Sequence, residues 1–247
     1  MKTNTAIHIR DVSKAFASEK LFQSLDLEID TGEFVTLLGS SGCGKTTVLR
    51  MLAGLDSPTS GQIHIPDPLK QSTSYVFQDA NLLPWKTVTE NVALPFQVGS
   101  LKDKYSVTQI QEISRNALAK VHLEKAAHLF PHELSGGMKM RVSLARAIAT
   151  SPKLLLMDEP FAALDEVTRF EMQNQLLELW QTEKMTIVFV THSLFEAAYL
   201  SQRVVLMKKS GSINQIKLDL PEKRDEKLRT SEKMIHIVQD LSERFRA

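Results

Sequence analysis

The chain has a single cysteine, Cys43, so no disulfide can form within it. Such scarcity favours a reducing compartment. Lysine and arginine together number 30, aspartate and glutamate 29, and the formal net charge is +1. This near-neutral balance gives no bulk electrostatic attraction to nucleic acid or to an anionic membrane surface. We therefore expect no nucleic acid among the partners of this protein.

Long apolar runs are also missing. No run approaches the roughly 20 residues that a helix needs to cross a bilayer. The first residues, MKTNTAIHIRD, lack the apolar centre of a signal peptide. Any role at a membrane is then expected to need a partner chain that spans it. Apolar residues are 43% and charged residues 24% of the 247, a balance typical of a soluble globular protein.

What the sequence does have is a glycine-rich stretch, GSSGCGKTT, at residues 39–47. An apolar run precedes it and a helical pattern follows it. The spacing matches G-x-x-x-x-G-K-T, in which glycines let backbone amides converge on phosphates and the next helix adds its positive end. A flexible loop that merely contains a lysine is the alternative, but the context favours a nucleoside triphosphate site. The residues expected to line that site are Gly39, Ser40, Ser41, Gly42, Cys43, Gly44, Lys45, Thr46 and Thr47.

Three side chains of this loop carry separate expectations. Lys45 would bring its charge to the β- and γ-phosphates, and the Thr46 hydroxyl would ligate Mg²⁺. Cys43 stands among backbone amides and near Lys45, a setting that favours the thiolate. We expect alkylation of this thiol to inhibit hydrolysis and ATP to protect it. A buried, inert thiol is the alternative.

The order of the expected elements indicates an α/β fold. Two segments, 6–9 and 25–29, alternate apolar and polar residues as half-buried antiparallel strands do. Short apolar runs instead suit parallel strands buried on both faces. These runs cover residues 34–38, 154–157, 186–190 and 204–207, and shorter strands are expected at 62–65 and 73–77. Expected helices cover residues 47–55, 87–97, 108–121, 138–149, 166–181, 193–200 and 232–246.

We expect one domain over residues 1–247. Residues 1–78 and 151–209 would form an α/β core with an antiparallel edge layer. Residues 79–150, which show no strand pattern, would form an inserted helical subdomain. Residues 210–247 would form a C-terminal extension that ends in a helix.

Polar side chains follow two of the buried strands. Asp158 and Glu159 end one apolar run, and His192 comes soon after another. Hydrolysis of a phosphoanhydride needs a metal anchor and a group that orients or deprotonates water, roles that suit Asp158 and Glu159 respectively. His192 would stand at the carboxyl edge of a parallel sheet, where α/β ligand sites form. The alternatives are a solvated acidic strand end and a structural histidine.

A second helix start, LSGGM at residues 134–138, also has the chemistry of an anion site. Ser135 can cap the helix, and Gly136 and Gly137 leave amides exposed at its positive end. On spacing alone, an ordinary capped helix is the favoured reading.

Taken in order, these motifs resemble the nucleotide-binding subunit of ABC transporters over about residues 7–207. The resemblance implies a P-loop NTPase fold with a parallel core sheet, an antiparallel β edge layer and an inserted helical subdomain. It makes residues 39–47 the Walker A loop, with Lys45 catalytic. It makes Asp158, with Thr46, a Mg²⁺ ligand of the Walker B motif and Glu159 the catalytic glutamate. The signature that contacts the partner chain's ATP would be Leu134, Ser135, Gly136, Gly137 and Met138.

The same resemblance gives roles to single residues. Phe16 resembles the aromatic residue that stacks on adenine, and Gln78 the glutamine that reaches Mg²⁺. Asp165 resembles the D-loop aspartate, and His192 the switch histidine that contacts the γ-phosphate. Met138 and Ala162 depart from the commonest residues, glutamine and serine.

Residues 77–95 (FQDANLLPWKTVTENVALP) are similar to importers of the nitrate, sulfonate and taurine type. This implies a homodimeric, Mg²⁺-dependent ATPase at the cytoplasmic face of the membrane, where it drives uptake through a separate permease. An extracytoplasmic solute-binding protein would complete the system. Leu83, Pro84 and Trp85 are expected to contact the permease because a loop between subdomains is usually surface, whereas Leu82 better suits the core. The alternative from another class is a soluble ABC ATPase that acts on ribosomes or DNA.

Overall fold

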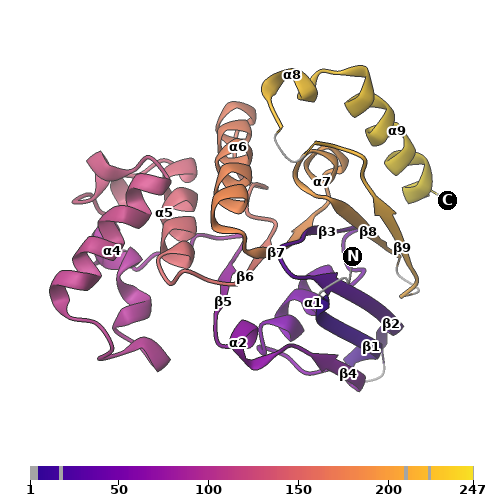
Figure 1. Ribbon diagram of the computed structural model, residues 1–247, viewed down its shortest axis with the longest axis horizontal. Helices are drawn as coiled ribbons and strands as arrows, with labels where there is room; N and C mark the ends of the chain where they lie inside the picture. The colour runs from indigo at the N-terminus through magenta and orange to yellow at the C-terminus, as the bar shows by residue number, and fades with distance from the viewer. Residues whose placement is uncertain (1–4, 17–18, 209–210, 222–223, 247) are drawn as a thin grey trace.

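The computed structural model describes residues 5–16, 19–208, 211–221 and 224–246. Within these residues the strands form two sheets, one of six strands and one of three (Figure 1). The boundary expected between residues 209 and 210 lies outside the described residues.

The larger sheet has the order β5-β6-β7-β3-β8-β9. Its strands are β3 (Phe34–Gly39), β5 (Thr73–Val76), β6 (Leu154–Asp158), β7 (Thr186–Thr191), β8 (Arg203–Met207) and β9 (Ile213–Lys217). β9 pairs antiparallel with β8, and the other neighbours are parallel. β3, β6 and β7 are buried along their whole length, as their apolar runs predicted. β9 was not predicted, because its INQIK sequence is only partly apolar and largely exposed.

The smaller sheet is antiparallel, with the order β2-β1-β4. Its strands are β1 (Thr5–Phe16), β2 (Glu19–Asp30) and β4 (Ser60–His64). Both long strands extend well beyond the alternating segments that predicted them. The pairing of β1 with β2 shifts register at several points, which interrupts the alternation on which the prediction rested.

Alternate residues of the larger sheet face two different hydrophobic clusters. Phe34 and Leu38 of β3 pack with the helices on one face. Val35 and Leu37 pack into the cluster that also holds α1 (Lys45–Leu52) and the inner face of the smaller sheet. β3 is therefore the central strand of a layered core, and the loop that follows it starts from that core.

A group of helices lies beyond β5, at one end of the molecule (Figure 1). It comprises α3 (Val88–Val92), α4 (Val107–Lys120) and α5 (Gly136–Ile148). Thr87 and Ser106 start α3 and α4 with reciprocal capping boxes. The helix expected over 87–97 is wrong in extent: α3 ends at Val92 and a 3₁₀ turn at Leu94–Phe96 follows, because Pro95 cannot donate a helical hydrogen bond.

The remaining helices are α2 (Asp67–Lys70), α6 (Glu166–Glu183), α7 (Leu194–Leu200), α8 (Glu226–Arg229) and α9 (Glu232–Arg246). α9 packs on α7 and contributes Met234 and Leu241, both fully buried, to the cluster on the Phe34 face. Within the described part of the chain, no helix combines the length and apolar character needed to cross a membrane.

Candidate functional site

Three adjacent parallel strands bring the predicted site residues to one edge of the larger sheet. The order β6-β7-β3 and the register, which pairs Leu38 with Thr191 and Asp158 with Val190, align the carboxyl ends of the strands. The loop 39–47, the Asp158–Glu159 pair and His192 therefore gather at this edge.

The loop has the tight geometry that its glycines predicted. Gly44 has φ +102°, and a Cβ there would lie 2.7 Å from the Phe22 ring, so no other residue fits. α1 begins directly after Gly44, which has no side chain to cap its amides. Lys45 is buried, and its ammonium donates hydrogen bonds to the carbonyls of Gly39 (2.8 Å) and Ser40 (3.1 Å). The amides and positive end of α1 suit an anion.

Asp158 is the centre of a small hydrogen-bonded group at the end of β6. The Thr46 hydroxyl donates to its Oδ1 (2.9 Å), and the Tyr75 hydroxyl donates to its Oδ2 (3.1 Å). Burial raises the pKa of the Asp158 carboxyl, and these two hydrogen bonds oppose the rise. Burial and the neighbouring carboxylate also raise the pKa of Tyr75, so its hydroxyl stays a donor. Tyr75 was not predicted, because no motif marks it and only the pairing of β5 with β6 brings it there.

Glu159 and His192 form a pair at the same edge. His192 Nδ1 lies 3.0 Å from Glu159 Oε2. Glu159 has φ +45°, a left-handed conformation that costs a non-glycine residue about 1 kcal/mol or more. Its backbone N–H donates to the Val190 carbonyl of β7 (3.0 Å), which holds it there. The His192 side chain is exposed, so the pair faces solvent at the edge where the loop 39–47 begins.

The LSGGM segment starts α5, as predicted. The Ser135 hydroxyl accepts a hydrogen bond from the Met138 N–H (3.2 Å) and caps the helix. Gly137 is required by packing, since a Cβ there would lie 2.3 Å from Thr168 on α6. Ser135 and Gly136 are exposed. α5 packs on α3, α4 and α6, so the segment opens a helix of the helical group and contacts α6 through Gly137.

The remaining predicted residues stand separately on the surface. Phe16 ends β1 with 53% of its surface exposed, and the Lys14 ammonium lies 4.9 Å from its ring centroid. Gln78 is exposed two residues after β5. Asp165 caps α6 by accepting from the Thr168 N–H (3.0 Å), and the hydrogen bonds it accepts lower its pKa.

The Cys43 thiol is not accessible, although the expected alkylation requires an accessible thiol. Its side chain is fully buried in the hydrophobic cluster shared by β3 and α1. The sulfur lies so close to Gly39 that a Cβ there would approach it to 2.6 Å. At this position of the loop the side chain packs into the core. The structure therefore has the buried thiol that was the alternative, and the access that alkylation would require is not present in the folded protein.

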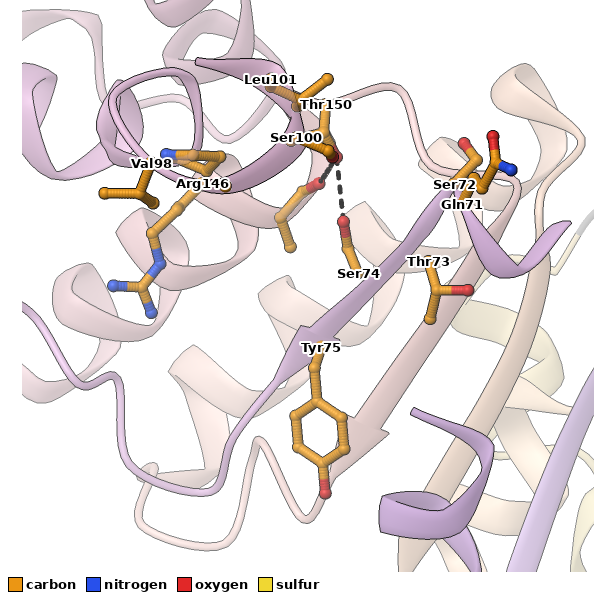
Figure 2. A pocket seen from close by; sticks show the side chains of 13 residues that line it. Gln71, Ser72, Thr73, Ser74, Tyr75, Val98, Ser100, Leu101, Arg146 and Thr150 are labelled. Atoms are coloured by element: carbon orange, nitrogen blue, oxygen red, sulfur yellow. Dashed lines mark hydrogen bonds between the residues drawn. The ribbon is translucent and has the colours of Figure 1, made fainter. Parts of the chain in front are cut away.

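A groove of about 440 Å³ separates β5 from the helical group (Figure 2). β5, the turns around Pro95 and Leu101, and the end of α5 line it. Ser74 and Thr150 are joined by a hydrogen bond of 2.9 Å, which links β5 to the end of α5. Arg146 lines the groove and donates to the carbonyls of Ala80 and Asn81, each at 2.8 Å. It thereby ties the segment after Gln78 to α5.

The segment 82–85 lies between β5 and α3. Leu82 is half-buried and packs on the core, as expected, whereas Trp85 has 70% of its surface exposed. The buried Asn91 side chain accepts from the Leu83 N–H (2.7 Å) and donates to the Leu83 carbonyl (3.2 Å). Asn91 thus fixes the backbone of the segment while the indole of Trp85 remains in solvent.

Comparison with known proteins decides the family. Residues 22–162 match the family model described as ABC transporter. The chain belongs to the ABC transporter family. It is an ATP-hydrolysing cassette of that family, and the α/β P-loop fold expected from the sequence is confirmed.

Two curated relatives and one solved structure illustrate the match. The cassette is 44% identical to the aliphatic sulfonates import ATP-binding protein SsuB 2 of Rhizobium johnstonii, covering 89% of this chain and 84% of the relative. It is also 44% identical to the spermidine/putrescine import ATP-binding protein PotA of Nitrosomonas eutropha, covering 85% of this chain and 58% of the relative. Its fold matches the ATP-binding cassette MJ0796, solved as a post-hydrolysis dimer with ADP and Pi, with TM-score 0.73 and 31% identity over 85% of this chain and 98% of the other.

Proposed function

We propose that this cassette hydrolyses ATP to drive import of a small solute through a separate permease. The observation that carries the proposal is the sheet edge at which Lys45, the Thr46–Asp158 pair and the Glu159–His192 pair converge. Both curated relatives described above are import ATP-binding proteins, which supports an importer over an ATPase of ribosomes or DNA.

The loop 39–47 would hold the triphosphate of ATP. Its amides and the start of α1 favour the phosphates, and Lys45 would turn from the loop carbonyls to the β- and γ-phosphates. Phe16, with its exposed ring, would stack on the adenine.

The oxygen ligands near Asp158 suit a magnesium ion. The Thr46 hydroxyl and an Asp158 oxygen already lie 2.9 Å apart, and hydroxyl and carboxylate oxygens are the donors that Mg²⁺ prefers. When bound, the ion would neutralise charge on the phosphates. Thr46 and Asp158 would hold it, with Gln78 as a further ligand from the exposed end of β5.

Glu159 would orient and deprotonate the attacking water. Its carboxylate is held by His192 at 3.0 Å and by a backbone conformation fixed against β7. His192 would contact the γ-phosphate from the neighbouring strand end.

Removing the metal should abolish hydrolysis. Chelation with EDTA is expected to lower turnover by at least about 10²-fold, because the ion contributes several kcal/mol of charge stabilisation. Thr46→Val should keep the loop but raise the Mg²⁺ concentration required for half-maximal turnover. Phosphate release measured across a Mg²⁺ titration tests both statements. Unchanged turnover in EDTA, or an unchanged Mg²⁺ requirement in Thr46→Val, would contradict the assignment.

We further infer a homodimer in which Ser135 and Gly137 of one chain reach the ATP held by its partner. Ser135 is exposed, and the helix that it caps packs on α3, α4 and α6. Leu134, Gly136 and Met138 complete the segment, and exposed Asp165 would lie at the same interface. The dimeric state of the MJ0796 cassette supports this arrangement.

The proposed subdivision follows the groove in Figure 2. Residues 1–78 and 151–209 would form the core, 79–150 the helical subdomain and 210–247 the C-terminal extension.

We propose that a permease segment docks at this groove and against Leu83, Pro84 and Trp85. Peripheral attachment to the cytoplasmic face and a solute-binding protein outside the membrane complete the proposal. The proposed solute is of the nitrate, sulfonate or taurine class. The PotA relative, named for spermidine/putrescine import, has the same 44% identity to this chain as the sulfonate relative.

Trp85→Ala should separate coupling from hydrolysis. The indole is 70% exposed, so its loss should leave folding and basal ATPase nearly unchanged while permease assembly weakens and uptake is lost. Co-purification with the permease and uptake in cells measure the two effects. Val107→Ala, at a similarly exposed apolar residue (73%) on α4, is the matched control and should behave as wild type. If Trp85→Ala instead unfolds the isolated subunit while its folded fraction assembles normally, Trp85 belongs to the core.

A further inference from the structure

The C-terminal extension inserts one arginine between α6 and α7. Arg229, at the end of α8, places its guanidinium against three aromatic rings. The distances from the guanidinium carbon to the ring centroids are 4.2 Å for Phe170, 4.7 Å for Phe195 and 5.6 Å for Tyr199. Such faces attract a cation. The three ring contacts therefore hold the Arg229 side chain in a defined conformation.

From this position Arg229 reaches a buried hydrogen-bond relay. Its Nη1 donates to Gln173 Oε1 (3.0 Å), and Gln173 Nε2 donates to Glu196 Oε1 (3.4 Å). Gln173 is 1% exposed and Glu196 6% exposed. Buried polar groups of this kind couple strongly, because water cannot replace a lost partner.

The relay ends beside His192. The Thr191 hydroxyl donates to Glu196 Oε2 (2.5 Å) and itself accepts from the Ser193 N–H (3.0 Å). The Glu196 N–H in turn donates to the Ser193 hydroxyl (3.3 Å). Both residues that flank His192 are thus fixed by Glu196.

The Glu196 carboxylate also lies near Arg169, which contacts the segment that follows Glu159. Arg169 Nε lies 3.8 Å from Glu196 Oε1. The Arg169 guanidinium also donates to the carbonyls of Phe161 (3.3 Å) and Leu164 (2.6 Å). Arg169 therefore links Glu196 to the segment that follows Glu159, while Glu196 itself contacts both neighbours of His192.

Independent contacts anchor the extension without Arg229. Arg224 donates to the carbonyls of Tyr199 and Ser201 at the end of α7, the second at 2.7 Å. Met234 and Leu241 of α9 are fully buried in the core. Loss of the Arg229 side chain should consequently leave the extension docked.

We propose that Arg229 is a positioning residue for His192, acting through Gln173 and Glu196. The C-terminal extension thereby sets the orientation of the histidine toward Glu159 and the γ-phosphate. This rests on the proposed function, in which His192 takes part in ATP hydrolysis.

Steady-state kinetics of the full-length chain tests the relay. Arg229→Ala is expected to lower kcat about 3- to 30-fold, the range for mutations in coupled networks, with KM for ATP within about twofold. KM should hold because none of the hydrogen bonds described above for the relay involves the loop 39–47. Arg229→Lys keeps a cation among the rings and should recover most of the loss. Gln173→Leu should reproduce the loss, and the double variant should be no worse than the poorer single one.

Two controls distinguish loss of the relay from a general effect on the extension or on folding. Lys233→Ala removes an exposed ion pair to Asp219 in the same extension and should keep wild-type kcat. Folding is followed by melting temperature for every variant. Normal kcat in folded Arg229→Ala, additive losses in the double variant, or no recovery in Arg229→Lys would overturn the proposal. Should Arg229→Ala not fold, Gln173→Leu and Arg229→Lys decide it.

The His192→Ala variant separates this proposal from the proposed function. Near-normal hydrolysis by His192→Ala would refute the role of His192 and, with it, the relay. An inactive His192→Ala beside a fully active Arg229→Ala would refute the relay alone.

Discussion

Replacing Glu159 by glutamine should lower ATP turnover by about 10²-fold or more while ATP binding persists. The amide keeps the size of the carboxylate and can still contact His192, which lies 3.0 Å from the carboxylate oxygen. It cannot take a proton from water. Asp158 and Thr46 are untouched, so the proposed metal ligands remain in place. With ATP bound and not hydrolysed, dimers should accumulate.

Three measurements on purified Glu159→Gln check this result: phosphate release, binding of a fluorescent ATP analogue, and the dimer fraction in ATP by light scattering. Glu166→Gln is the matched control, since Glu166 is an exposed carboxylate in the first turn of α6. It should hydrolyse ATP like wild type. Lys45→Ala should differ in kind, by losing ATP binding itself. Near-normal hydrolysis by Glu159→Gln would remove Glu159 from the mechanism.

Parts of the fold could be predicted because single segments carry their own signal. β6 is apolar up to Asp158 and β7 is apolar between Thr186 and Thr191, and a strand buried on both faces of a parallel sheet favours that composition. β9 lies at the sheet edge and is largely exposed, so its sequence resembles that of a loop. Pro95 could have ended the expected helix at 87–97 on sequence grounds, since proline interrupts the hydrogen-bond ladder.

The candidate site could be predicted where a motif fixes both the residue and its place, as for Lys45 and Asp158. Contacts that tertiary packing creates between distant segments could not be predicted. Tyr75 is 83 positions from Asp158, and Arg146 is 65 positions from Asn81. Cys43 shows the opposite failure: its sequence neighbours are polar, but the direction of its side chain is set by the core beneath the loop.

Mixing two inactive variants should restore ATP-dependent association. One chain holds two helix starts whose amides suit an anion, at Lys45 and at Ser135, and we propose that one ATP contacts one of each from different subunits. Lys45→Ala removes the proposed phosphate contact, and Ser135→Arg places a long side chain at the exposed start of α5. Each homodimer then lacks any complete site. A heterodimer retains one.

Random pairing leaves about one site in four complete, so the mixture should regain measurable hydrolysis as well as dimers in ATP. Ser135→Arg also removes a helix cap, worth about 0.5–2 kcal/mol, and this alone could weaken α5. Ser106→Arg is the matched control, because Ser106 caps α4 in the same way and lies outside the proposed interface. That variant should keep wild-type hydrolysis. Analytical ultracentrifugation and phosphate release on the mixture give the test, and recovery of neither association nor turnover would contradict a site shared between two chains.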